Sequence, residues 1–469
     1  MPLRDGESAL DQIVLRLPDH GVEISNWTSY RFTQNFQIPT AAWSFTLPPS
    51  VAGGSYRSFD DPDSTGASGP GKELLTGIQT GARVEISLND RLQCTGYVEK
   101  ITSEVSPNGG TLYTIEGRDI LGPVVDACID PAYKFTSGST ILDCILGVLA
   151  PFGIDTVYTS DDLNVSVVTG LPKGASGTRQ KVKVKIPKRV AKADGTIELQ
   201  YDTRDSTVVV DARRRDLRRI TVKQIKPKMG EGVFAFLDRI LRRFGLMIWA
   251  AADGSGVVVD APTFDTSTMA YKITHRNGLT NENNVLSGSV VRDVMGQPSL
   301  IVGFATGGGQ TADKTRNKVI MVNELVAYDY NEDLNPEPIE VVQDIKARYK
   351  GAKVIPPRTE VIGLEFLGKH RPAPMFIKDD ESYDMEQLEA FVRRKMAELQ
   401  QKSLVATYEV AGHTYKNLPW GVNTMVDVFD EVQDVLEPMW CVEKTFKKSR
   451  AGGTTTTIKL IRPKTFQIN

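Results

Sequence analysis

The chain has 469 residues, with 56 Lys and Arg against 58 Asp and Glu, so its net charge is −2. This length predicts roughly three to four domains, and the balanced charge gives no overall attraction to nucleic acid or to a membrane surface. No apolar run reaches the roughly 18 to 20 residues that a membrane span needs, and the charged Met1–Gln12 lacks the apolar region of a secretory signal. We therefore expect a protein that is made and folded in a cytoplasm.

The N-terminal part of the chain has the alternating pattern of β-strands. Ile13–Leu17 predicts one strand and Trp27–Leu47 predicts several more. Gly81–Leu88 and Leu92–Ile101 alternate on either side of Asn89-Asp90, which is typical of a hairpin turn. These patterns predict an all-β domain.

Two features of this part bear on function. Residues 49–71 are rich in Gly, Ser, Asp and Pro, which indicates a long exposed loop. Several aromatic residues could form either a sugar-binding surface or the core of the domain, and we expect the core. These residues include Trp27, Tyr30, Trp43 and Tyr56.

Helical signals dominate the next part. Ser139 or Thr140 can cap a helix that runs to Leu149 and ends at Pro151 and Gly153. A second helix begins near Glu231 and is stopped by Gly245. The strands 246–250 and 257–260 then form a hairpin about Asp253-Gly254.

Between these helices, Lys181–Lys228 is markedly basic. Clustered Lys and Arg can bind a polyanion, but Lys181–Ile186 and Thr207–Val210 alternate like strands with one solvated face. The segment also lacks the interleaved aromatic residues on which single-stranded nucleic acid stacks. We therefore favour solvated strands or contact with an acidic partner subunit over nucleic-acid binding.

The C-terminal part predicts an amphipathic helix followed by strands. Between Met385 and Ser403, helical spacing places apolar residues along one face, which must dock on another element. The apolar residues are Leu388, Phe391, Val392, Met396 and Leu399. Strands are predicted at 405–411, 425–429 and 440–446, with turns between them, and the helix and strands together are expected to close a small barrel or sandwich.

No motif for catalysis or for metal binding stands out. The four histidines, His20, His275, His370 and His413, do not form a metalloprotease motif, and no nucleophile-elbow, Walker or dinucleotide-binding sequence is present. Gly307–Gly309 follows a strand, but the polar run after it lacks the helical periodicity of a phosphate-binding turn.

Acidic and sulfur side chains give no stronger signal. The acid pairs Asp60-Asp61, Asp161-Asp162 and Asp379-Asp380-Glu381 lie in polar runs where solvated carboxylates are the norm, although a glycosidase would need two such groups. The cysteines are scattered, without zinc-ligand spacing, and we expect buried free thiols. They are Cys94, Cys128, Cys144 and Cys441. We predict no catalytic, cofactor-binding or metal-binding residues, and no enzyme activity.

Several blocks of the sequence resemble phage Mu-type tail hub proteins. Gly117–Cys128 is similar to their GRDLLxDLVD block, and Ser139–Ile154 to the helix that follows it. Met229–Leu246 resembles their GET helix and its RxxGL end, and Gly278–Leu286 resembles their GxNIL block. Met385–Phe466 is similar to their closing helix, W-P-N segment and GTTTLxLxxPxAF end. Each block is short, but the five occur in the family's order.

The resemblance also has departures. Asn164–Val222 and Gln310–Lys378 are longer than the family's corresponding segments, and Pro419-Trp420 reverses its Trp-Pro order. The resemblance implies a baseplate hub of a contractile tail, related to the hub part of type VI secretion spike proteins. Such a hub is a homotrimer with two tube-like barrels per chain, so that a pseudo-sixfold ring meets the hexameric tail tube on one face and the trimeric spike on the other.

We therefore expect an α+β, mainly β fold, with two tail-tube-like antiparallel β-barrel domains and a mixed α/β middle region. Four domains are expected. Residues 1–125 form the first barrel, and residues 126–263 form the middle region, which contains a basic insertion near 164–222. Residues 264–384 contribute strands shared with the barrels and contain an insertion near 310–378, and residues 385–469 supply the helix and strands that complete the second barrel. The expected location is the virion tail baseplate, assembled in a bacterial cytoplasm, with other baseplate components as partners and DNA passing through the lumen without specific binding. The alternative is a carbohydrate-binding or cell-wall-hydrolysing tail-associated β-protein.

Overall fold

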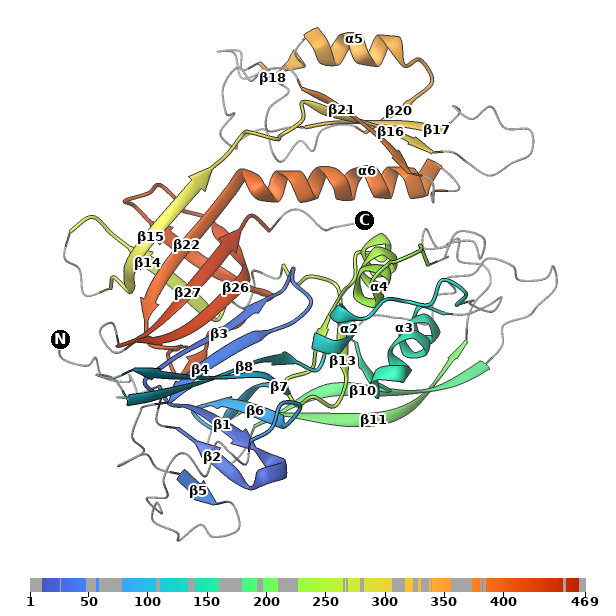
Figure 1. The fold of residues 1–469 in the computed structure, drawn as a ribbon. Coiled ribbons are helices and arrows are strands. Elements are labelled where there is room, and N and C mark those ends of the chain that lie inside the picture. Colours follow the sequence, from blue (N-terminus) through green and yellow to red (C-terminus); the bar gives the residue numbers. More distant parts are fainter. Residues whose placement is uncertain are drawn as a thin grey trace.

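Most of the described chain is β-structure, and its helices gather in two regions (Figure 1). The computed structural model describes residues 11–25, 27–47, 56–58, 78–106, 110–133, 140–159, 179–191, 197–209, 227–264, 266, 269–278, 282–305, 317–323, 328–329, 337–338, 340–355, 373–379, 382, 385–449 and 453–463. Among them, no helix is long and apolar enough to cross a membrane.

A 14-stranded sheet forms the body of the molecule. In pairing order its strands are β15 (Val285–Arg292), β22 (Leu404–Ala411), β27 (Gly453–Ile461), β26 (Pro438–Ser449), β3 (Ser29–Asn35), β4 (Ala42–Leu47), β8 (Gly110–Asp119), β7 (Arg91–Ser106), β6 (Arg83–Leu88), β1 (Ile13–Leu17), β2 (Val22–Ile24) and β5 (Tyr56–Ser58). Beside this path, β25 (Thr424–Asp430) pairs with β26, and β14 (Tyr271–His275) pairs in parallel with β25. All other pairs in the sheet are antiparallel. The mainly β class predicted from the sequence is confirmed.

The two ends of the chain are joined in this sheet by β3 and β26. Residues 438–441 of β26 pair with β25, and after Val442 the same edge of β26 pairs with β3 instead. Phe446 lies opposite Phe32, and both are fully buried in one core with residues from both ends of the chain. The pairings among the described residues therefore run as one continuous path from β15 to β5. They do not close into the two separate barrels expected from the sequence, because β26 is long enough to pair with both halves.

The predicted N-terminal strands and hairpin are confirmed. Strand β1 has the predicted bounds, and β6 and β7 form the hairpin about Asn89-Asp90. Both turn residues have positive φ, 48° and 60°, as a two-residue turn that follows the sheet twist requires. Trp27, Tyr30 and Trp43 are buried in the core, as predicted.

Three α-helices and a small sheet make the middle region. The helices are α2 (Gly122–Asp126), α3 (Ile141–Leu149) and α4 (Val233–Leu241), and the sheet is β12 (Met247–Ala250), β13 (Val257–Asp260) and β9 (Val157–Tyr158). Thr140 and Asp143 form a capping box at α3. Short 3-10 turns η2 (Ala150–Phe152) and η3 (Arg242–Phe244) end in left-handed Gly153 and Gly245, at the predicted stops. A separate two-stranded ribbon, β10 (Arg179–Ala191) and β11 (Ile197–Val209), contains the strands predicted in the basic segment.

A second α/β region lies at the top of Figure 1. Its sheet has the order β20 (Lys353–Ile355), β17 (Asn317–Val322), β16 (Leu300–Ala305) and β21 (Pro374–Asp379). Helix α5 (Glu340–Arg348) covers one face and α6 (Met385–Gln400) covers the other. Alternation along β16 explains this arrangement, because Leu300 and Val302 pack with α5 while Ile301 and Ala305 pack with α6. The remaining short elements are η1 (Pro18–His20), β18 (Tyr328–Asp329), β19 (Glu337–Pro338), η5 (Gln401–Ser403), β23 (Thr414–Tyr415) and β24 (Leu418–Pro419).

The predicted C-terminal helix is confirmed, and the structure shows which element its apolar face packs on. Leu388, Val392 and Met396 are fully buried against β16 and β17, rather than against the strands that follow the helix in sequence. Gly303 permits the close approach, since a Cβ there would clash with Val392. The strands after the helix, β22, β25, β26 and β27, belong to the large sheet, and β22 has the predicted alternation of buried residues.

Candidate assembly surface

Strand β15 is the most exposed long strand of the described part of the large sheet. It pairs with β22 along one edge, and most of its residues are exposed on both faces. Its apolar residues Leu286 and Val291 are 57% and 54% exposed, whereas alternate residues of the neighbouring β22 are buried. An edge strand with free backbone groups and exposed apolar side chains is a template for pairing with another chain. Strand β15 is therefore the candidate assembly edge of the described part of the sheet.

The turn between β25 and β26 lies beside this strand. Arg292 Nη2 of β15 donates hydrogen bonds to the carbonyl oxygens of Gln433, at 2.9 Å, and Asp434, at 2.6 Å. The turn adds exposed apolar residues, since Val432 and Leu436 are 49% and 57% exposed. We call β15 together with residues 431–437 the β15 surface.

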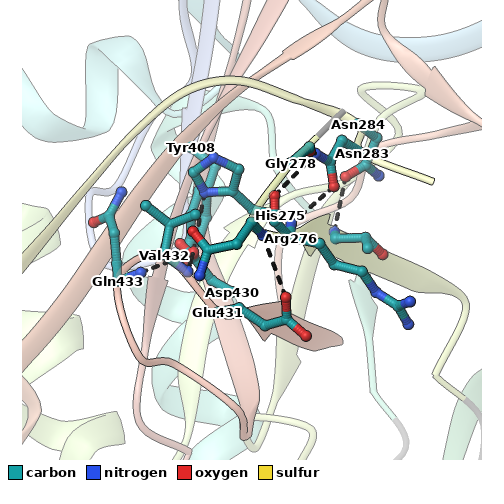
Figure 2. A network of polar contacts seen from close by, with 12 residues as sticks. His275, Arg276, Gly278, Asn283, Asn284, Tyr408, Asp430, Glu431, Val432 and Gln433 are labelled. Atoms are coloured by element: carbon teal, nitrogen blue, oxygen red, sulfur yellow. Dashed lines mark hydrogen bonds and ion pairs between the residues drawn. The ribbon is translucent and has the colours of Figure 1, made fainter. Parts of the chain in front are cut away.

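A buried carboxylate holds the turn in place, as Figure 2 shows. Asp430, at the end of β25, is fully buried. Its Oδ1 accepts hydrogen bonds from the backbone N–H groups of Val432 and Gln433, both at 3.0 Å, and lies 3.0 Å from His275 Nδ1. Its Oδ2 accepts from the Tyr408 hydroxyl at 2.9 Å. One side chain thus connects the turn to β14 and to β22.

The electrostatics of this network favour hydrogen bonding over proton transfer. Burial, and then the hydrogen bond to Asp430, raise the pKa of Tyr408 far above its usual range. The hydroxyl therefore stays protonated and donates to the carboxylate. Backbone bonds reinforce the turn, because Asp430 and Val435 exchange N–H···O bonds of 2.8 and 2.9 Å. This arrangement fixes the turn between β25 and β26.

Two asparagines fix the loop that leads into β15. Asn283 Oδ1 accepts from the Arg276 N–H at 2.8 Å, and its Nδ2 donates to the carbonyls of Arg276 and Gly278, each at 3.2 Å. Asn284 Oδ1 accepts from the Thr274 N–H at 2.9 Å, and its Nδ2 donates to the Lys272 carbonyl at 2.8 Å. The block Gly278–Leu286, noted in the sequence as a resemblance, therefore connects β14 to β15 and sets where β15 begins.

The other polar residues considered in the sequence are placed in structural roles. His413 is buried, with Nε2 2.7 Å from the Tyr30 hydroxyl and Nδ1 2.9 Å from Thr456 Oγ1. Among the described residues, no group of three or more His, Cys, Asp or Glu side chains could hold a metal ion. Gly307–Gly309, His370, the Asp60 and Asp161 pairs and the Tyr56 side chain lie outside the described residues.

Two expectations about single residues are wrong. Asp379 was expected to be solvated, but it is buried at the end of β21, where Arg243 Nη2 lies 3.0 Å from its Oδ1 and the Ser382 hydroxyl donates to its Oδ2. Cys128 was expected to be a buried thiol, yet it is exposed, while the other three cysteines are buried. Both errors arise because local sequence does not reveal which distant element packs over a position.

The N-terminal part of the chain is similar to a known family. Residues 13–119 match the family model described as Mu phage baseplate assembly protein GpP-like, N-terminal. The match spans β1 to β8, the strands for which the sequence predicted an all-β domain. The resemblance to Mu-type tail proteins drawn from the sequence is thus confirmed.

The chain has the fold of two solved tail proteins. It is similar to the tail protein from Neisseria meningitidis MC58, with 16% identity, a TM-score of 0.61 and coverage of 97% of this chain and 98% of that one. It is also similar to the 43 kDa tail protein of prophage MuSo2 from Shewanella oneidensis, with 17% identity, a TM-score of 0.60 and coverage of 98% and 100%. No curated protein matches the chain. Residues 13–119 therefore match the GpP-like N-terminal model, and the chain shares the fold of these two tail proteins.

Proposed function

We propose that this protein is the structural hub of the baseplate in a contractile phage tail or a tail-like particle. The observation that carries the proposal is the GpP-like match over residues 13–119, together with a fold shared along nearly the full length of a Mu-type prophage tail protein. The hub would be a homotrimer without enzymatic activity. It would join the hexameric tail tube to the trimeric central spike, and DNA would pass through its lumen without specific binding.

The division into two tube-like modules is part of the proposal. Strands β1 to β8 would form the first module, within residues 1–125, and β14, β15, β22 and β25 to β27 would form the second. Three chains would then contribute six modules to a pseudo-sixfold ring. The shared core around Phe32 and Phe446 supports this, because two modules joined through one continuous sheet keep a fixed angle, as ring closure requires.

The β15 surface is the contact that we propose between neighbouring chains. A cyclic trimer uses heterologous contacts, in which one surface of each chain meets a different surface of the next. In the part of the chain that the structure describes, strand β15 pairs along one edge only and has exposed apolar residues, and the Asp430 network fixes the adjacent turn. A rigid surface reduces the conformational entropy lost on association.

The test compares two variants with equal numbers of new charges. Leu286→Lys/Val291→Lys changes the β15 surface, and Val105→Lys/Met229→Lys changes two other exposed positions. Light scattering should give a wild-type mass near three times 51.6 kDa, with rings in negative-stain images. We expect the β15 variant to be a folded monomer and the control to remain a trimer.

Two outcomes would count against the proposal in different ways. A wild-type chain that remains monomeric, alone and with its spike, would contradict the trimeric hub. A β15 variant that still forms trimers would leave the hub standing and exclude β15 as the contact.

A further inference from the structure

Helix α5 covers only part of one face of the four-stranded sheet β20-β17-β16-β21. It packs on the two central strands, where Leu300, Val302 and Ile320 are fully buried. On the outer strands of the same face, Val354 of β20 is 40% exposed and Phe376 of β21 is 50% exposed. The sheet therefore has an exposed apolar margin along β21.

Phe376 belongs to an aromatic cluster at the end of α5. Tyr349 directly follows α5, and its ring lies 6.2 Å from that of Phe376 and 5.8 Å from that of Phe304 on β16. Lys318 Nζ of β17 lies 5.8 Å from the centre of the Tyr349 ring, within the range of a cation–π contact. Because Phe304 and Tyr349 are partly buried in the core under α5, the cluster positions Phe376 and still leaves it half exposed.

Basic residues surround this cluster. In the parallel register of β16 with β21, Lys378 lies opposite Phe304, on the same face as Phe376, and it is exposed. The last turn of α5 and the residue after Tyr349 add further cations. Together with Lys318 and Lys378, these are Lys346, Arg348 and Lys350. The last two turns of α5 hold one acid, Asp344, which pairs with Arg348 at 3.3 Å. The margin is therefore basic and attracts acidic groups.

Strand β21 is also an edge of this sheet. It pairs with β16, and no strand among the described residues pairs along its other side. An edge strand can accept an extended segment through backbone hydrogen bonds, and alternate side chains of that segment then lie on the same face of the sheet. The end of β21 is fixed, because Arg243 Nη2 lies 3.0 Å from Asp379 Oδ1.

The face that carries Phe376 is turned away from the middle region. Helix α6 covers the opposite face of the sheet, and its Glu398 lies 3.7 Å from Arg242 of η3. Figure 1 accordingly shows α5 on the outer side of the sheet and α6 on the inner side. A partner can therefore approach the β21 margin without displacing the middle region.

We propose that β21 binds an extended acidic segment of a partner protein by strand addition. An apolar side chain of that segment would lie against Phe376, and a carboxylate would lie against Lys378. A lysine on an edge strand disfavours pairing with basic or wholly apolar strands, so it selects for acidic ones. Single-stranded nucleic acid fits less well, because it cannot pair with a strand edge and Phe376 is the one ring of the cluster that is half exposed. The proposed site does not use the β15 surface and does not require the trimer.

The first experiment measures binding of labelled peptides to the full-length protein by fluorescence anisotropy. One peptide library alternates Asp or Glu with apolar residues, and a control library has Lys or Arg in place of the acids. We expect binders in the acidic library alone, and we expect high NaCl to weaken them, because salt screens the attraction. An acidic library without binders, or equal binding of both libraries, would overturn the proposal.

A matched pair of variants locates the site. Phe376→Ala/Lys378→Glu changes the β21 margin, and Val354→Ala/Lys402→Glu makes the same kinds of change on β20 and on η5, at exposed positions. The two variants have equal net charge, and circular dichroism verifies that both are folded. We expect the β21 variant to bind the acidic peptides roughly tenfold more weakly than wild type, and the control within about twofold of it. Equal losses in both variants would exclude β21 as the site.

The wild-type protein supplies a test that needs no variant. Methylation of alternate backbone nitrogens in a bound peptide removes its N–H donors along one edge, in either of two registers. We expect one register to abolish binding, and retained binding in both would overturn strand addition. Unlabelled oligothymidylate should not displace the peptide, and displacement would make nucleic acid the occupant and overturn the proposal. These outcomes are independent of the mass of the wild-type particle, so they separate failure of this site from failure of the hub.

Discussion

Two contacts join distant parts of the chain by different forces. We call the pairing of β3 with β26 the seam, and the contact of the middle region with the α/β region the junction. The seam is apolar, with Phe32 and Phe446 fully buried and their rings 5.9 Å apart. The junction is ionic, with Arg243 of η3 paired to Asp379 at 3.0 Å and Arg242 near Glu398 of α6 at 3.7 Å. Apolar burial is insensitive to charge state, whereas a buried ion pair fails when either partner is lost. We therefore expect the loss of one charge to open the ionic junction and to leave the apolar seam intact.

The largest effect is expected at the seam. Phe446→Ala should lower the free energy of unfolding by about 3–5 kcal/mol, because it removes a fully buried ring and leaves a cavity between the two ends of the chain. Urea denaturation measures the change, and Val105→Ala, at an exposed position, serves as the control. If the two variants were equally stable, the seam would not hold the halves together.

The ionic junction should respond more locally. Asp379→Asn leaves the Arg243 guanidinium without its charged partner and should cost about 2–4 kcal/mol. Hydrogen exchange should accelerate in β21 and α6 while β26 stays protected. Asp344→Asn, which breaks an exposed pair with Arg348 in α5, is the control and should change stability by less than about 0.5 kcal/mol. Faster exchange throughout the large sheet would contradict a separable junction.

The smallest expected effect is a pH dependence within the seam. Burial lowers the pKa of His413 to about 4 from the 6.5 of an exposed imidazole. Between pH 6.5 and 4 the unfolded chain binds a proton that the folded chain excludes, so the free energy of unfolding falls as the pH decreases, by at most about 3 kcal/mol. The loss ends below pH 4, where both states are protonated.

The change in the free energy of unfolding with pH, compared between wild type and His413→Gln, separates the effect of His413 from that of the carboxylates that titrate over the same range. Denaturant unfolding of wild type and His413→Gln across pH 4 to 7 gives the two slopes, independent of the lower overall stability of the variant. The wild type should lose stability more steeply. Parallel curves would show that the folded protein accepts the proton on His413 without cost.

Part of the candidate site could be predicted from the sequence and part could not. The block Gly278–Leu286 was noted, and the structure shows its asparagines fixing the start of β15. Asp430, Tyr408 and His275 were missed as a group, because 22 and 155 residues separate Asp430 from its two side-chain partners. A polar residue at the end of an apolar strand was the one local signal, and it points to a turn rather than to those partners.

The sequence by itself determined the features that depend on neighbours in the chain. Asn89-Asp90 forms a hairpin turn, and Thr140 caps a helix. The apolar residues along one side of Met385–Gln400 determine which face of that helix is buried. Each follows from backbone preferences or from periodicity within one element. Tertiary structure alone decided that β26 pairs with both β25 and β3, that α6 packs on β16, and that Asp379 is buried. These outcomes depend on which surfaces meet across long sequence separations, where many pairings satisfy the same local pattern and only the packing of the whole core selects one.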